Sequence, residues 1–349
     1  MRYLFPLVLL FLSPAVRAQS PFWQHAGGPP GARIEHVAYD SVGGVALAAS
    51  RSTLYRLAPG ETRWEVVFRT TDRIADLHVH SAHSIFVSTL HEFEGSRQGT
   101  LWRSEDGGMH WDQASLAVQS SKILVATDPA GVLYAAGGAV LYRSEDAGHS
   151  WSTHALPWGH FDVLAFGPPG VIYLVNHVFD GMMSTDGGAT WIPLLGYTDT
   201  DLLAFAVDTD GWVYASLVNW GTSYYVSVTD TLAGPNGLMG NWDEGRDLRP
   251  AHPARVLVAG PRGTMFAGTF GGGVYRTRDH GVTWQHSGLR GHYVLSLATG
   301  SAGLLHAARK ARLRDQASRG VSNALRIDLS GRRVGVGVPT TAVAGDLMA

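Results

Sequence analysis

The chain has 349 residues, including 43 glycines and 16 prolines, and it contains no cysteine, which excludes disulfides, thiol nucleophiles and cysteine-ligated metal centres. Only 16% of the residues are charged and 45% are hydrophobic, a balance that favours short strands joined by tight turns over a helical or disordered chain. The formal net charge is −2, and segment 19–305 has 17 basic against 26 acidic residues, so we expect no nucleic-acid partner.

Residues 1–18, MRYLFPLVLLFLSPAVRA, have the pattern of a secretory signal peptide. Arg2 precedes an apolar run from Leu4 to Leu12, and the run is too short to span a bilayer. We expect cleavage after Ala18, with a retained N-terminal anchor as the alternative. Later segments have no comparable apolar run, so we expect no transmembrane segment in the mature chain and an exported protein that is periplasmic, cell-surface or secreted.

From residue 34 onward the sequence repeats a unit of about 40 to 50 residues, a period typical of β-propellers. The sequence of each complete unit predicts four strands. The first is apolar and is followed by a turn with Gly or Asp, the second contains aromatic or β-branched residues, and the fourth begins with a Trp. The units begin at Ile34, Ile74, Ile123, Val163, Leu203, Val256 and Val294.

The unit at Val294 has only two recognisable strands, whereas FWQHAGG from Phe22 is similar to TWQHSGL from Thr283. This predicts that an N-terminal strand pairs with the last blade, which would close the ring and hide both sheet edges. The predicted fold class is therefore all-β: a single propeller of four-stranded blades over residues 19–305, with seven blades, and six or eight as alternatives.

Four units contain the pattern Ser/Thr-x-Asp-x-Gly-x-x-Trp, at 104–111, 144–151, 184–191 and 277–284, which we call the box segments. The Asp can accept backbone N–H groups within a turn, the Ser or Thr adds a local hydrogen bond, the Gly permits positive φ, and the Trp can pack between blades. We predict a structural role for Ser104, Asp106, Gly108, Trp111, Ser144, Asp146, Gly148, Trp151, Ser184, Asp186, Gly188, Trp191, Thr277, Asp279, Gly281 and Trp284.

The box segments resemble the Asp-box, or BNR repeat, of sialidases, sortilin-type receptors, some xyloglucanases and photosystem II assembly factors. The resemblance covers residues 22 to about 300 and includes degenerate copies in the units at Ile34 and Leu203. It implies that each box lies on the hairpin between the third and fourth strands, away from the ligand-binding face. Asp106, Asp146, Asp186 and Asp279 are therefore not catalytic candidates.

The opposite face should carry the loops between second and third strands and the connections between blades. Aromatic platforms beside a few polar groups suit glycans and peptides alike. The predicted ligand-binding residues on these loops are Phe93, Trp158, His160, Phe179, Trp220, Phe270 and Tyr293. The alternative is that several of these side chains fill the central channel or cap the blades.

Glycoside hydrolysis would require two carboxylates beside the scissile bond, for which Glu92, Asp180 and Asp201 are the candidates. The Arg-Ile-Pro motif of sialidases is matched only by Arg33-Ile34-Glu35, which lacks the Pro, and the xyloglucanases with these repeats typically use two propellers. We therefore expect a non-catalytic binding or assembly module that engages a glycan or a protein, with a glycoside hydrolase as the alternative.

No metal or cofactor is predicted. HVHSAH, residues 78–83, places His78 and His80 on one face of a strand, where a third ligand could complete a zinc or copper site, but core or surface histidines explain the run equally. Segment 306–349 has eight basic and three acidic residues and is predicted either to complete the last blade or to form a solvated tail. Within it, ALRIDLSGRRV loosely resembles the C-terminal sorting domains of exported bacterial proteins.

Overall fold

The computed structural model describes residues 24–25, 28–29, 32–40, 42–81, 83–94, 96–116, 122–177, 181–194, 200–219, 224–229, 253–300, 304–310 and 323–328. All regular secondary structure in these ranges is β-strand, as predicted. None of them contains a helix that could cross a membrane. The predicted signal peptide lies outside the described residues.

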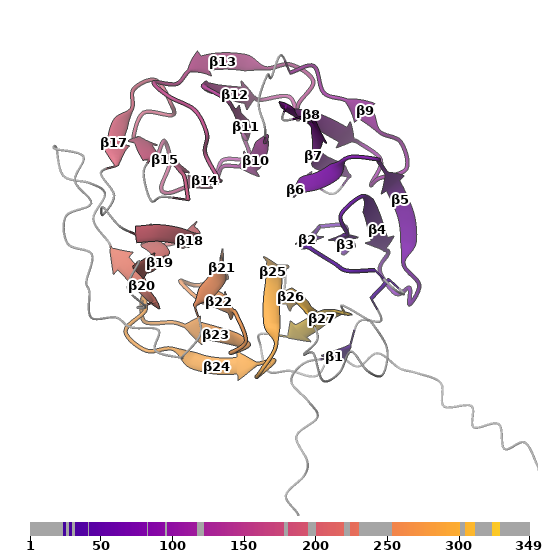
Figure 1. The fold of residues 1–349 in the computed structure, drawn as a ribbon, viewed down its shortest axis with the longest axis vertical. Helices are drawn as coiled ribbons and strands as arrows, with labels where there is room; N and C mark the ends of the chain where they lie inside the picture. The colour runs from indigo at the N-terminus through magenta and orange to yellow at the C-terminus, as the bar shows by residue number, and fades with distance from the viewer. Residues whose placement is uncertain are drawn as a thin grey trace, which may run out of the picture.

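Within the described residues the strands form seven antiparallel sheets arranged in a ring, the arrangement of a β-propeller (Figure 1). In six of the sheets, successive strands along the chain are neighbours. The first of these contains β2 (His36–Tyr39), β3 (Ala46–Ala49), β4 (Thr53–Leu57) and β5 (Glu65–Arg69). The second contains β6 (Arg73–Ser81), β7 (Ser84–Phe93), β8 (Ser96–Ser104) and β9 (Asp112–Gln113).

The next four sheets continue around the ring. The third has β10 (Leu124–Thr127), β11 (Leu133–Gly137), β12 (Val140–Ser144) and β13 (Ser152–Ala155). The fourth has β14 (Val163–Phe166), β15 (Ile172–Val175), β16 (Gly181–Ser184) and β17 (Ile192–Leu194). In the described residues the fifth has three strands, β18 (Thr200–Val207), β19 (Val213–Asn219) and β20 (Tyr224–Thr229). The sixth has β21 (Ala254–Ala259), β22 (Met265–Thr269), β23 (Val274–Thr277) and β24 (Gln285–Gly288).

The seventh sheet combines the first described strand with the last three. It contains β25 (Tyr293–Thr299), β26 (Leu304–Lys310), β27 (Asn323–Asp328) and β1 (Gln24–His25), with β1 outermost. β1 pairs with β27 through Gln24 opposite Arg326 and His25 opposite Leu325. β26 and β27 extend this sheet past residue 305, where the sequence repeat becomes unrecognisable.

Burial between neighbouring sheets supplies the core. The second strand of a sheet is sandwiched between the adjacent sheets, so β3, β11, β15 and β22 are buried at every residue. One apolar cluster joins Tyr173 of β15 to Phe205 of β18, whose rings lie 5.5 Å apart. Another joins Ile34 and Ala48 to Ala308 of β26, and thereby connects the first sheet to the seventh. Because both faces of such a strand are covered, its sequence is mostly apolar and does not alternate between apolar and polar residues.

Each box segment connects the third and fourth strands of its sheet in one hydrogen-bonded turn. In the first copy Asp106 Oδ1 accepts the N–H groups of Met109 and His110 at 2.8 and 2.9 Å. The buried Ser104 hydroxyl donates to Asp106 Oδ1 at 2.9 Å and accepts the N–H of Gly108 at 2.8 Å. Trp111 Nε1 then donates to the carbonyl of Val67 in the preceding sheet at 2.9 Å. The turn therefore holds its own loop in shape and attaches it to the preceding sheet.

The residue after the box Asp has positive φ in every copy. It is Gly107 at 72° and Gly187 at 74°, but Ala147 at 55° and His280 at 51°. A Cβ in this region costs roughly 1 to 2 kcal/mol for residues other than glycine. The box backbone is thus set by the hydrogen-bond pattern even where the sequence disfavours it.

We expect Ala147→Gly to stabilise the protein and Gly187→Ala to destabilise it, each by about 1 kcal/mol. A Cβ on Gly187 would meet no atom within 4 Å, so the second variant isolates the backbone effect. Urea unfolding of both variants provides the measurement. Effects of the same sign would contradict the interpretation.

Candidate functional site

The loops opposite the box segments bring two of the predicted ligand-binding aromatics together. Phe270 follows β22 and Tyr293 opens β25; they form an isolated antiparallel bridge, and their rings are 4.3 Å apart at 65°. The guanidinium carbon of Arg255, in β21, lies 5.7 Å from the Phe270 ring centroid. Phe270 is 45% exposed. We call Arg255, Phe270 and Tyr293 the aromatic patch.

A second exposed aromatic lies at the end of β7. Phe93 is 60% exposed and stacks on His91, with ring centroids 6.3 Å apart. His91 Nδ1 lies 2.8 Å from Asp72 Oδ1, on the connection from the preceding sheet. Among the described residues, Phe93 and Phe270 are the only aromatics in the set of exposed large hydrophobic side chains. Phe93 ends the second strand of its sheet, and Phe270 directly follows the second strand of its own.

The other predicted ligand-binding residues are placed differently. Trp158 is half-buried and packs against an apolar cluster that includes Leu156 and the buried Phe161, so it belongs to the core between sheets. His160 is exposed, with a φ of 74°. Phe179 and Trp220 lie outside the described residues. The structure thus brings Phe270 and Tyr293 together, although Tyr293 is a strand residue and not the loop residue that the sequence predicted. Arg255, which no motif marks, was not predicted from the sequence.

Two of the described carboxylates near these loops lie beside basic side chains. Glu92 Oε1 lies 3.5 Å from Arg97 Nε, and Asp162 Oδ2 lies 3.1 Å from His177 Nδ1. Asp201 is a half-buried strand residue of β18, opposite Val218. Asp180, the third candidate for catalysis, lies outside the described residues. Glycoside hydrolysis requires two carboxyl groups that flank one bond, and these contacts instead tie Glu92 and Asp162 to local bases.

Two histidines of HVHSAH connect the second and third sheets. His78 Nε2 and His80 Nδ1 lie 2.6 and 3.0 Å from the Thr127 hydroxyl of β10. Burial lowers the pKa of His78 to about 4, so this ring is neutral at pH 7. Asp76 in the same strand accepts the N–H of Val125 at 3.2 Å. This segment therefore supplies polar contacts between sheets.

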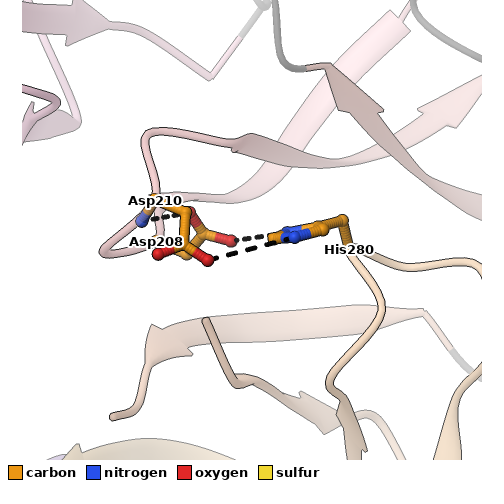
Figure 2. A group of neighbouring side chains, drawn as sticks. All are labelled: Asp208, Asp210 and His280. Atoms are coloured by element: carbon orange, nitrogen blue, oxygen red, sulfur yellow. Dashed lines mark hydrogen bonds and ion pairs between the residues drawn. The ribbon is translucent and has the colours of Figure 1, made fainter. Parts of the chain in front are cut away.

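On the box face, a cluster that the sequence did not predict links the fifth and sixth sheets (Figure 2). Asp208, in the turn between β18 and β19, has a fully buried side chain. It accepts the N–H groups of Asp210 and Trp212, each at 2.9 Å, and the Tyr214 hydroxyl at 3.0 Å. His280 Nδ1, from the box segment of the sixth sheet, lies 3.2 Å from Asp208 Oδ2. The imidazole stacks on Trp212, with centroids 4.5 Å apart.

The fourth sheet has the same turn without the aspartate. Gly167 stands six residues before Tyr173, as Asp208 stands six before Tyr214, and the buried Tyr173 hydroxyl has no hydrogen-bond partner. Burial raises the pKa of both tyrosines, so both hydroxyls stay protonated at neutral pH. A hydroxyl bonded to a buried carboxylate stabilises the fold, whereas a buried unpaired hydroxyl costs free energy.

We therefore expect Tyr214→Phe to lower the free energy of unfolding by about 2 kcal/mol, because Asp208 loses a donor. Tyr173→Phe should be neutral or stabilising by up to about 1 kcal/mol. Chemical denaturation of the two variants in parallel is the measurement. Equal losses would mean that packing, and not hydrogen bonding, governs both positions.

The box aspartates should make stability sensitive to acid. Hydrogen bonds from the Thr190 hydroxyl and N–H and from the Ser184 hydroxyl lower the pKa of Asp186 to about 2. A carboxylate whose pKa is lowered in the folded state stabilises the fold fully at pH values above 3.8, its pKa in the unfolded chain. This contribution to stability is lost as the pH falls toward 2. Asp186→Asn should reduce the fall in Tm between pH 4 and pH 2. An unchanged profile would contradict this assignment.

Comparisons with known proteins place the chain by its fold. No protein-family model and no curated relative matches it. Among solved structures it is similar to "YCF48 bound to D1 peptide", with 16% identity and a TM-score of 0.60 over 89% of this chain and 98% of that one. It is also similar to a GH74 xyloglucanase from Xanthomonas campestris, with 17% identity and a TM-score of 0.62, covering 90% of this chain and 54% of the enzyme.

A third similar structure is PorZ, described as a bacterial surface component of the type-IX secretion system of Porphyromonas gingivalis. It has 16% identity and a TM-score of 0.56, covering 86% of this chain and 47% of that one. At such identities the similarity defines the class of fold: the chain is a β-propeller, as the repeats predicted.

Proposed function

We propose that this protein is an exported, non-catalytic binding module that engages a protein or glycan through the face opposite the box segments. The aromatic patch is the observation that carries the proposal. Phe270 and Tyr293 present an edge-to-face pair beside the Arg255 guanidinium, and Phe270 remains 45% exposed. Such a surface offers apolar area and a cation together, which suits a peptide or a sugar ring.

We also propose that the seven sheets are seven blades and that the β1–β27 pair closes the ring. The apolar clusters that span neighbouring sheets, including the one from Ala308 to Ala48, support this count. A closed ring holds the loops of different blades at fixed separations. A ligand can then contact several loops without ordering the scaffold first, which lowers the entropic cost of binding.

The similar structures are consistent with either ligand. One is described as YCF48 bound to D1 peptide, and another is a xyloglucanase that is nearly twice as long as the matched region. The hydrolase alternative is less well supported because Glu92 and Asp162 contact Arg97 and His177. For the same reason, binding without turnover is the expected behaviour.

Glycan and peptide arrays, probed with protein that starts at Gln19, test the proposal. We expect hits whose affinity falls about tenfold or more in Phe270→Ala and Tyr293→Ala, because truncating a central aromatic removes a large contact. Val282→Ala is the matched control, since Val282 is 60% exposed but lies in a box segment on the other face. Thermal melts of each variant verify folding.

Product release from any glycan hit would overturn the non-catalytic assignment and would direct substitution to Glu92 and Asp201. If a ligand binds both patch variants as tightly as the unmodified protein, its binding site does not include the aromatic patch. An equal loss in Val282→Ala would show that the effect is not specific to this face.

A further inference from the structure

We propose that Asp208, Asp210 and His280 form a binding site for a divalent transition-metal ion of the zinc type. The site lies on the box face between the fifth and sixth sheets, away from the aromatic patch, and does not depend on the proposed function. One donor atom from each side chain lies within 4.8 Å of the other two (Figure 2). Two carboxylate oxygens with one imidazole nitrogen suit zinc better than calcium or magnesium, which prefer oxygen ligands alone.

The spacing of the donors fits a single ion. Zinc ligands at about 2.0 to 2.1 Å from the metal lie about 3.3 Å apart in a tetrahedral site. Asp208 Oδ2 and His280 Nδ1 are 3.2 Å apart. Asp210 Oδ2 is 3.9 Å from His280 Nε2, beyond the range of a hydrogen bond. The two carboxylates thus face different ring nitrogens, so an ion bound to Nδ1 would require Asp210 to move toward that nitrogen, with little movement of Asp208.

Neighbouring groups hold Asp208 and His280 in place, whereas Asp210 is more exposed and can move. The backbone N–H groups and the Tyr214 hydroxyl orient Asp208, as outer hydrogen bonds commonly do for metal-ligating carboxylates. Stacking on Trp212 holds the His280 ring. Asp210 is 53% exposed and His280 30% exposed, so an ion can enter from solvent and keep a water ligand.

Gly263, in the turn between β21 and β22, preserves the space beside Asp210. A Cβ at this position would lie 2.5 Å from Asp210 Oδ2 and 3.6 Å from His280 Cε1. The N–H of Gly263 donates to the Thr209 hydroxyl at 3.1 Å, which holds the two turns together. Three loops from two sheets therefore converge on the donors.

A related pair on the same face provides a matched control. His149 Nε2 lies 2.6 Å from Glu105 Oε1, and this contact joins the box segments of the second and third sheets. No third ligand of the described residues completes a metal-binding group there. His149→Ala therefore removes an equivalent link between sheets without removing a proposed ligand.

Isothermal titration of zinc chloride into chelator-treated protein without a histidine tag tests the site. We expect binding in the unmodified protein and in His149→Ala, with affinity reduced by about tenfold or more in Asp210→Asn and in His280→Ala. Asp210→Asn keeps the backbone donor to Asp208, so it is the variant least able to disturb folding; melting curves without metal verify this. Cobalt(II) should give visible absorption that the same two variants lose.

An absence of zinc binding would overturn the proposal. Full retention of zinc affinity by Asp210→Asn or by His280→Ala would also overturn it, because binding would then arise from other histidines. If His149→Ala loses as much zinc affinity as His280→Ala, the loss arises from breaking a contact between sheets and not from removing a metal ligand.

Discussion

Burial between neighbouring sheets is the constraint on which the rest of this structure depends. A single four-stranded sheet has two apolar faces, and strands such as β11 and β15 are buried at every residue only because a sheet lies on each side. The driving force, roughly 25 cal/mol for each Å² of apolar surface removed from water, is therefore realised between sheets. A ring satisfies this requirement for every sheet, whereas an open stack would expose two terminal faces.

The two faces of the ring serve this constraint differently. On the box face, short turns fold on themselves and reach the preceding sheet, as Trp111 does with Val67. Gly148 shows how close the sheets approach there, since a Cβ would lie 2.9 Å from the Phe86 ring of the second sheet. On the opposite face, the aromatic side chains of Phe93 and Phe270 remain exposed.

Polar side chains complete the contacts between sheets. Thr127 bonds to both His78 and His80, and Asp208 bonds to His280 across a separation of 72 residues. The strands and turns that carry these groups orient them. Their hydrogen bonds therefore specify how neighbouring sheets align at an otherwise apolar interface. The same orientation makes the Asp208 cluster suitable for a ligand that needs fixed donors.

The sequence by itself determined the class of fold, the box turns and the strand order within the repeats. These features are local: Asp106, Ser104 and Gly108 interact within five residues, so their spacing is visible in the chain. The mostly apolar strands likewise follow from burial on both faces.

Only the tertiary structure decided which distant residues meet. The repeats predicted that an N-terminal strand joins the last blade, but only the structure identified its partner as β27, which lies beyond the recognisable repeats. The structure also placed Trp158 in the core while Phe270 stayed exposed beside Arg255. It also brought His280 to Asp208 and Asp210, which no spacing rule connects. Contacts between sheets depend on the twist and separation of neighbouring sheets, and these are properties of the assembled propeller that a single repeat does not contain.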